Sequence, residues 1–315
     1  MADIIKTATR EAYGKALVEL GAINDKVVVL DADLAAATKT GMFKKAYPDR
    51  FFDSGICESN MMGVAAGLAT TGYVVFASTF AMFAAGRAFE QVRNSIGYPH
   101  LNVKIGATHA GISVGEDGAS HQCCEDIGLM RTIPGMTIIN PADAVEARQA
   151  VLAAAEYEGP VYMRFGRLAV PNVFDESYKF EWGKAVVLSE GTDVTICATG
   201  LMVNEAVEAK KILADKGISA EIVNVHTIKL LDAETILKSA AKTGAIVTAE
   251  EHSIIGGLGS AVCEAVGESK VRVPVVRLGV NDVFGKSGPA VELLHIYGLD
   301  AAGIARKAEE AISLK

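Results

Sequence analysis

Hydrophobic runs long enough to cross a bilayer are missing from this chain, although half of its 315 residues are hydrophobic. The apolar residues 61–88 come nearest, but Gly63, Gly67, Gly72 and Arg87 interrupt them. Such an interrupted run indicates a buried helix, a strand and a second helix. No basic segment followed by an apolar one stands at the N-terminus, so no export signal is expected. We therefore expect a cytoplasmic protein without membrane contact.

An excess of basic residues is also absent. Asp and Glu number 38 against 30 Lys and Arg, which leaves a net charge of −8. Nucleic acid is therefore not an expected partner, although a local basic pocket for a small anion remains open. A phosphate-binding loop with its lysine is lacking, and Gly256–Gly259 does not match the dinucleotide-binding pattern. That segment suits close packing of a helix on a strand instead.

Cysteine is scarce, and the five cysteines have no spacing typical of metal ligands. Cys123 and Cys124 are adjacent in the sequence, an arrangement that seldom allows the two to pair. An odd number of cysteines without an export signal fits reduced thiols in a cytosolic protein. We expect no metal site in this chain.

Strand-like apolar runs alternate with helical runs along nearly the whole chain. This alternation predicts an α/β architecture with mostly parallel sheets covered by helices. The pattern is interrupted by a looser segment that contains the only tryptophan. We predict two domains, residues 1–175 and 191–315, joined by a linker over residues 176–190.

The expected elements follow from these runs and their boundary residues. Ser59 is expected to cap the helix that follows it, and Gly72 to lie just past the end of that helix. Strands are expected at residues 27–31, 51–56, 73–77, 102–107, 136–139, 161–165, 194–198, 220–225, 245–249 and 273–278. Helices are expected at residues 9–20, 59–70, 80–96, 121–131, 142–157, 204–216, 233–243, 259–266 and 301–313.

The segment from Gly106 to Gln122 is the most informative in the chain. It places His109, Asp117 and His121 among several glycines, directly after an expected buried strand. Polar titratable side chains on such a loop are typical of α/β active sites. Their spacing matches neither a helical histidine pair nor a calcium loop, and no nucleophile elbow accompanies them. They suit general acid–base chemistry and the recognition of hydroxyl groups.

Four further residues are candidates, each with a structural alternative. Glu58 follows an expected strand and begins a helix, where negative charge is stabilised whether or not the residue has a function. Phe80 and Phe83 share a helix face, as core residues or as a platform for a ring. Arg164, at a strand end, is either a fixed cation for an anionic group or half of a salt bridge.

The loops after three of the expected parallel strands are predicted to meet. These loops follow residues 56, 77 and 107, and the carboxyl ends of parallel strands share one edge of a sheet. Ligands of open α/β proteins usually bind at that edge. The candidate side chains are therefore predicted to form one site.

Taken together, these motifs make the chain resemble the C-terminal section of transketolase, in the thiamine diphosphate enzyme superfamily. The strings are Gly115-Glu-Asp-Gly-Ala-Ser-His-Gln122 and Ser78-Thr-Phe-Ala-Met-Phe83, which follow Glu58 in the right order. The run that begins Glu250-Glu251-His252 also resembles the same superfamily. The resemblance covers essentially the whole chain and implies a pyrimidine-binding domain followed by a transketolase C-terminal domain.

The resemblance implies how this chain would hold its cofactor. Glu58 would hydrogen-bond the pyrimidine nitrogen of thiamine diphosphate and favour the imino tautomer, whose exocyclic nitrogen takes the proton from the thiazolium carbon. Phe80 and Phe83 would pack on the pyrimidine ring. Asp33 matches an acidic residue near the cofactor end of the site.

The same resemblance assigns residues to the substrate. Asp117 would bind a substrate hydroxyl group, and His121 would assist proton transfer at the reacting carbon. Arg10, His109 and Arg164 would surround the phosphate of the sugar. The implied activity is transfer of a two-carbon ketol unit between sugar phosphates, as in the pentose phosphate pathway.

Three departures from the family pattern stand out. Ala37 occupies a position where transketolases often have a phosphate-binding serine, and Thr38 is expected to replace it. Gly86 stands where an aromatic residue often completes the pyrimidine pocket. The Gly-Asp-Gly motif and downstream Asn that hold Mg²⁺ and the diphosphate are missing in that form. We therefore expect a split enzyme, in which a separate subunit supplies the diphosphate-binding domain and its Mg²⁺ within an α2β2 assembly.

Three alternatives remain open at this stage. Chemistry like that of 1-deoxy-D-xylulose-5-phosphate synthase would share much of the histidine loop, but that family normally has one fused chain. The beta subunit of a 2-oxoacid dehydrogenase would explain the split but not the loop. A non-catalytic assembly subunit would not need the retained Glu58, Phe83, His109, Asp117 and His121.

Overall fold

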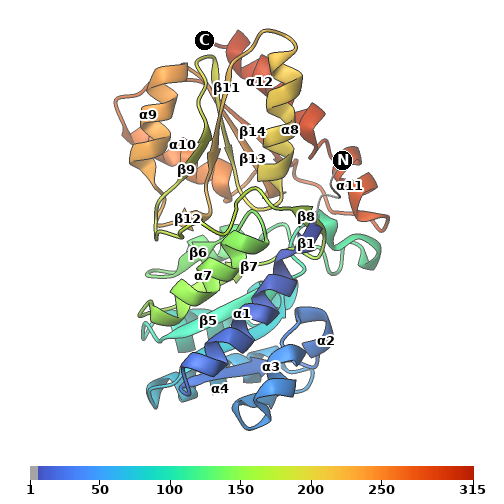
Figure 1. Ribbon diagram of the computed structural model, residues 1–315, viewed down its shortest axis with the longest axis vertical. Coiled ribbons are helices and arrows are strands. Elements are labelled where there is room, and N and C mark those ends of the chain that lie inside the picture. The colour runs from blue at the N-terminus through green and yellow to red at the C-terminus, as the bar shows by residue number, and fades with distance from the viewer. Residues whose placement is uncertain (1–5) are drawn as a thin grey trace.

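The protein is represented by a computed structural model, and the structure describes residues 6–315. The expectation about an export signal concerns in part residues 1–5, which lie outside the described residues. Two α/β units follow one another, the N-terminal one in the lower half of Figure 1 and the C-terminal one in the upper half. Within the described part of the chain, no helix combines the length and the hydrophobicity that a membrane span requires.

The first sheet has seven strands in the order β12-β6-β7-β5-β4-β2-β3. All its pairings are parallel except that of β12, which runs antiparallel to β6. The strands are near-continuous apolar runs because helices cover both faces of the sheet. Their bounds are β2 Val27–Asp31, β3 Phe51–Asp53, β4 Val74–Phe80, β5 Val103–Thr108, β6 Thr137–Ile139, β7 Val161–Arg164 and β12 Thr227–Lys229.

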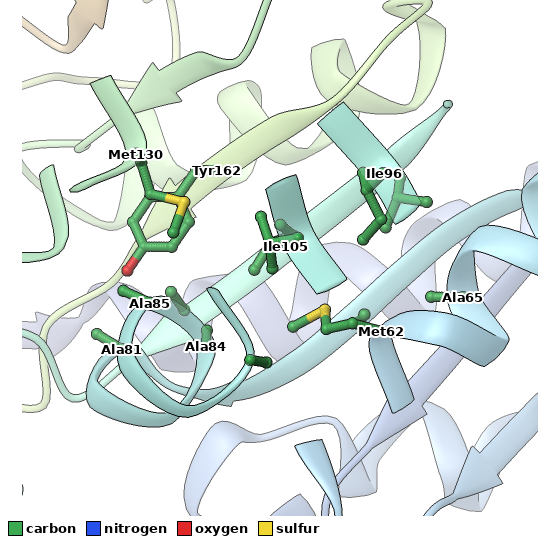
Figure 2. Close-up of a cluster of buried hydrophobic side chains, with 14 of the residues drawn as sticks. Met62, Ala65, Ala81, Ala84, Ala85, Ile96, Ile105, Met130 and Tyr162 are labelled. Carbon is green, nitrogen blue, oxygen red and sulfur yellow. The ribbon is translucent and has the colours of Figure 1, made fainter. Parts of the chain in front are cut away.

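Two hydrophobic clusters pack on the two faces of this sheet. Helices α1 (Thr9–Ile23), α3 (Gly41–Ala46) and α7 (Ala144–Glu156) contribute to one cluster. Helix α4 (Glu58–Thr70) and α6 (Asp126–Arg131) contribute to the other, which Figure 2 shows. Full burial of one Val, Leu, Ile, Phe or Met side chain in such a cluster stabilises the fold by about 1.5–3 kcal/mol.

The second sheet has five strands in the order β14-β13-β10-β11-β9, and only β9 is antiparallel to its neighbour. Helices α8 (Met202–Ala214) and α12 (Ala301–Ser313) pack on one face, and α9 (Ala233–Thr243) and α10 (Leu258–Glu268) on the other (Figure 1). The strands are β9 Val186–Ser189, β10 Val194–Ala198, β11 Ala220–Asn224, β13 Ile246–Ser253 and β14 Val275–Val280. The predicted α/β class is confirmed.

The remaining elements are short, and the sequence patterns did not predict them. Strand β1 (Lys6–Ala8) pairs antiparallel with β8 (Ala169–Pro171). Helix α2 (Ala35–Thr38) follows β2, and α11 (Ala290–Ile296) precedes α12. Elements of this length show too little periodicity to be recognised.

The helix predicted at residues 80–96 is not continuous. It consists of a π-helix at Phe83–Arg87, α5 at Phe89–Gln91 and a second π-helix at Val92–Gly97. In the first π-helix the Ala88 N–H donates to the carbonyl of Phe83 at 3.0 Å. Because π-turns are wider than α-turns, such segments are rare and frequently occur at functional sites.

Two helix starts also differ from the prediction. Helix α4 begins at Glu58 without a side-chain cap, and Ser59 donates to the carbonyl of Arg87 instead. Helix α6 begins only at Asp126, because the preceding residues form turns that include Gly118 at φ 75°. Gly72 lies past the end of α4 at φ 87°, as predicted.

The segment between the two units is anchored to both by two buried carboxyl groups. Asp143 caps α7 and also accepts hydrogen bonds from the backbone N–H groups of residues 173 and 174. Glu146 accepts hydrogen bonds from Tyr178 at 2.7 Å, from Asn224 of β11 at 2.8 Å and from the N–H of Ala142 at 2.7 Å. Burial raises the pKa of Glu146 to about 7.

The raised pKa of Glu146 gives a pH dependence of stability. Between its ordinary pKa of 4.5 and about 7, the folded chain binds more protons at this group than the unfolded chain does. The contribution of Glu146 to the free energy of unfolding must therefore fall as the pH rises through this window. We expect Glu146→Gln to flatten that fall, as measured by urea unfolding from pH 5 to pH 7.5. Glu176→Gln, on an exposed linker residue, is the control, and equal slopes in both variants would contradict the assignment.

Candidate active site

The carboxyl ends of three parallel strands bring the predicted residues to one edge of the first sheet. In the register of the sheet, Asp31 of β2 lies opposite Asp53 of β3 and Ser78 of β4, and Phe80 of β4 lies opposite Thr108 of β5. Glu58, Phe83 and His109 follow directly after these strand ends. The prediction that the three loops share an edge is confirmed.

Glu58 is held in the first turn of α4, and its side chain is 1% exposed. The unpaired N–H groups of the helix N-terminus favour a negative charge at this position. Both carboxylate oxygens accept hydrogen bonds from Arg87, at 3.0 and 2.9 Å. Arg87 also lies over the ring of Phe83, 4.7 Å from its centroid. No pattern in the sequence points to this partner of Glu58.

Two phenylalanines and two histidines form a continuous aromatic cluster beside Glu58. The rings of Phe80 and Phe83 are nearly parallel with centroids 5.8 Å apart, and His109 stacks on Phe80 at 3.9 Å. His121 presents its edge to both phenylalanines, at 6.3 and 5.6 Å. Phe80 is 7% exposed, whereas Phe83 is only partly buried. Phe83 therefore offers a ring face at the site in addition to its packing role.

His109 is an uncharged imidazole at neutral pH. Burial and the nearby charges of Arg10 and Arg167 lower its pKa to about 3. Arg10 lies 3.2 Å from Nε2, and because a guanidinium can only donate, Nε2 is the acceptor. The proton is therefore assigned to Nδ1, which lies 3.0 Å from the hydroxyl of Thr108. His109 keeps a φ of 53°, in the left-handed region.

The loop between the two histidines carries Asp117. A 3₁₀ segment, η4 (Ile112–Asp117), follows His109 and places Asp117 on the surface. His121 is partly buried and lies 2.9 Å, through Nδ1, from the hydroxyl of Ser120. The structure thus brings His121 to the aromatic cluster and leaves Asp117 accessible on the same loop.

Several cations surround His109. The charges of Arg10, Arg167 and Lys39 all disfavour protonation of its ring. Arg10 is fixed by a hydrogen bond to the carbonyl of Ala37 at 2.7 Å, and Arg167 pairs with Glu116 at 2.7 Å. These guanidinium groups concentrate positive charge beside His109 in an acidic protein, which suits a small anionic ligand.

Arg164 is not one of these cations beside His109, which differs from the prediction. Its side chain is 4% exposed and donates to Asp126 at 2.8 Å and to the carbonyl of Glu251 at 2.8 Å. Arg164 lies in β7 with its guanidinium turned into the protein, whereas Arg167 follows the strand end. The position of Arg167, just beyond a strand and after a glycine, is the sequence feature that could have identified this residue.

Asp33 lies on the loop after β2 with a φ of 61° and is exposed. Its backbone N–H donates to the carboxylate of Asp53 at 3.1 Å.

The hydroxyl of Thr38 is buried and donates to Asp31 at 2.7 Å. Thr38 therefore does not replace the phosphate-binding serine of the family as expected. Burial raises the pKa of Asp31 to about 6.

The family models match both halves of the chain. The transketolase pyrimidine-binding domain matches residues 5–172, and the transketolase C-terminal domain matches residues 183–304. A pyrimidine-binding domain joined to this C-terminal domain defines a class of thiamine-diphosphate-dependent enzymes. The chain belongs to the transketolase family.

Its similar relatives are of corresponding length. The putative transketolase C-terminal section of Methanocaldococcus jannaschii is 53% identical over 96% of this chain and 95% of that protein. A 6-deoxy-6-sulfo-D-fructose transketolase subunit from a Clostridium species is 45% identical over 97% and 95%. This chain therefore corresponds to the C-terminal section of a split transketolase.

Solved structures agree with this assignment. A split-gene transketolase, described as an inactive beta4 tetramer, has a TM-score of 0.90 at 56% identity and covers 98% of this chain and 99% of its own. A transketolase from Pichia stipitis has the same fold, with a TM-score of 0.83 at 24% identity. This chain covers 46% of that longer protein.

The ion pair of Glu58 and Arg87 can be measured by a double-mutant cycle. One partner is buried and the other half-exposed, so we expect a coupling free energy of about 1–2 kcal/mol between Glu58→Gln and Arg87→Ala. Urea unfolding of the chain gives this value. The exposed pair of Lys211 and Glu208 is the control, with an expected coupling near zero. Additive effects at Glu58 and Arg87 would contradict the pair.

Proposed function

We propose that this chain is one subunit of a split transketolase that transfers a two-carbon ketol unit between sugar phosphates. The observation that carries the proposal is the position of Glu58 beside the Phe80–Phe83 pair and two histidines, at the edge of a pyrimidine-binding domain. When bound, thiamine diphosphate supplies the nucleophilic carbon for the reaction. The residues present fit its pyrimidine end, because a buried carboxylate and a partly buried phenylalanine ring are connected through Arg87.

The proposed cofactor contacts use four residues of this chain. Glu58 holds a proton at the pyrimidine nitrogen, a role that requires Arg87 to leave its carboxylate. Phe83 packs on the pyrimidine ring, and Phe80 supports Phe83 from the opposite side. Asp33 faces the cofactor end of the site from the loop after β2. The burial of Glu58 at a helix N-terminus supports its proposed role.

The proposed substrate contacts come from the histidine loop and the cations near it. Asp117 accepts a hydrogen bond from a substrate hydroxyl group, and His121 moves a proton at the reacting carbon. His109, as a neutral imidazole, lies beside the phosphate of the sugar and accepts a hydrogen bond from Arg10 through Nε2. Arg10 and Arg167 bind the anionic end of the sugar, and Arg167 takes the place that the sequence analysis gave to Arg164.

A separate subunit is proposed to complete the site. Within residues 6–315, no group of three or more His, Cys, Asp or Glu side chains is arranged to hold a metal ion. The diphosphate and Mg²⁺ are therefore proposed to bind on a partner with the missing Gly-Asp-Gly motif. Relatives that are themselves single subunits, such as one of an apulose-4-phosphate transketolase in Phocaeicola vulgatus, support this division.

We propose an α2β2 assembly that acts in the cytoplasm, within the pentose phosphate pathway. The relative described as an inactive beta4 tetramer indicates that a chain of this type also associates with itself. We propose that this chain likewise associates with itself until the partner subunit binds. A 1-deoxy-D-xylulose-5-phosphate synthase is 38% identical, but this chain covers only 48% of it, so a fused enzyme of that type is the less favoured alternative.

The function is tested by reconstitution. We expect the chain, mixed with its partner, thiamine diphosphate and Mg²⁺, to transfer a ketol unit from xylulose 5-phosphate to ribose 5-phosphate. Glu58→Gln should lower turnover by at least a thousandfold with an unchanged circular dichroism spectrum, because the group that holds the pyrimidine proton is lost. Glu90→Gln, on the exposed side of α5, is the matched control. Pyruvate consumption, or activity of this chain alone, would overturn the proposal.

The cations beside His109 give a second test. Arg167→Leu should raise KM for xylulose 5-phosphate about 10–100-fold, because a charge-assisted contact to the phosphate is lost. KM for a ketol donor without a phosphate should change little. Arg148→Leu, which breaks an ion pair with Glu19 between α7 and α1, should leave both constants unchanged. Equal effects on both donors would remove Arg167 from the phosphate site.

A further inference from the structure

The histidine loop, residues 109–121, is held at its start by a carboxylate from the second unit. The backbone N–H of Ser113 in η4 donates to Oε1 of Glu251, which lies in β13 and is 3% exposed. The backbone carbonyl of Glu251 accepts a hydrogen bond from Arg164 of β7 at 2.8 Å. One residue of the second sheet therefore contacts both the loop and the strand that precedes the linker.

The end of the same loop is held by a second contact with the C-terminal unit. The side-chain amide of Gln122 donates to the carbonyl of Ile112 at 3.1 Å and to the carbonyl of Lys286 at 2.9 Å. Helix α11 packs directly against η4. The loop is thus fixed between its two histidines by contacts from outside its own domain.

At Gly111 and Gly118, residues of the second unit lie so close to the loop that no side chain would fit. A Cβ added to Gly111 would lie 2.4 Å from Cδ of Glu251, and one added to Gly118 would lie 2.3 Å from Oγ of Ser287. Both glycines also have a positive φ, at 80° and 75°. Glycine makes a free loop mobile, so the rigidity of this one depends on the contacts that the second unit supplies.

We propose that Glu251 is a positioning residue for the reaction, which sets the placement of Asp117 and His121 through the N–H of Ser113. This inference rests on the proposed function. It gives the C-terminal unit a defined part in the site, namely to hold the substrate side of it. Active-site groups must be held within a fraction of an ångström, so a mobile loop lowers the rate.

The two sides of the site respond differently to this residue. Glu58 and Phe83, the proposed pyrimidine contacts, come from α4 and the first π-helix. The Glu58 carboxylate is bonded to Arg87, whereas that of Glu251 is bonded to the histidine loop. Loss of the Glu251 carboxylate should therefore affect binding and turnover of the sugar without affecting the cofactor. A general loss of folding would affect both.

The experiment compares Glu251→Ala, Glu251→Gln and Glu250→Ala in the complex with the partner subunit, thiamine diphosphate and Mg²⁺. We expect Glu251→Ala to lower kcat/KM for xylulose 5-phosphate at least tenfold, with an unchanged half-saturation concentration of thiamine diphosphate. Glu251→Gln keeps an oxygen acceptor for the N–H of Ser113 and should restore kcat/KM to within about threefold of the wild type.

Glu250→Ala is the matched control. Glu250 is the adjacent, equally buried carboxylate, and it accepts hydrogen bonds from the N–H groups of Leu258 and Gly259 inside the C-terminal unit. Its loss should lower the melting temperature without changing the kinetics of the folded complex. A drop of kcat/KM in Glu250→Ala equal to that in Glu251→Ala would overturn the proposal.

Hydrogen exchange gives a readout that does not need activity. In Glu251→Ala the amides of residues 112–122 should exchange at least tenfold faster, whereas in Glu250→Ala they should not. If Glu251→Ala does not fold, Glu251→Met, which keeps the side-chain volume but has no oxygen acceptor for the N–H of Ser113, is measured instead, with the same expected results. If the folded variant has the same amide exchange rates and the same kcat/KM as the wild type, the proposal is overturned. A wild-type complex that transfers no ketol unit would instead overturn the proposed function.

Discussion

The buried ion pair between Arg164 and Asp126 is the interaction on which the rest of the molecule depends. It joins β7 to α6 at 2.8 Å, and Tyr162 donates to the same carboxylate oxygen at 3.0 Å. Nη2 of Arg164 donates to the carbonyl of Glu251 in the second unit. Because breaking a buried pair leaves an uncompensated charge, the pair fixes the guanidinium that contacts the second unit. Glu251 of that unit in turn contacts the histidine loop through the N–H of Ser113.

The sequence predicted the long elements and the shared sheet edge because both follow from hydrophobic patterning. Strand β2 and helix α9 were found with correct bounds, Phe83 and His121 lie in contact, and Arg87 connects Glu58 to Phe83. The π-turn after β4 could not be foreseen, since hydrogen-bond spacing leaves no trace in an apolar run. Arg164 was misplaced for a similar reason, because the partner that buries it, Asp126, is remote in sequence. Arg87 and Glu251 were missed because their roles depend on contacts across the fold.

The electrostatics of the site follow from its position in an acidic chain. Arg10 and Arg167 concentrate positive charge around His109 and keep its ring neutral. The carboxylate of Glu58 is paired with Arg87, whose guanidinium lies over the ring of Phe83. Each charged group near the aromatic cluster therefore has a fixed place before any ligand binds.

The contact of Arg87 with Glu58 has a thermodynamic consequence for any ligand that uses this carboxylate. An arginine on the neighbouring π-turn is an intramolecular competitor, present at a high effective concentration whatever the solution contains. The apparent affinity of an incoming ring is its intrinsic affinity multiplied by the fraction of chains in which the guanidinium has withdrawn. A partner surface that drew Arg87 away would remove this competition and so strengthen binding at Glu58, without touching the carboxylate itself.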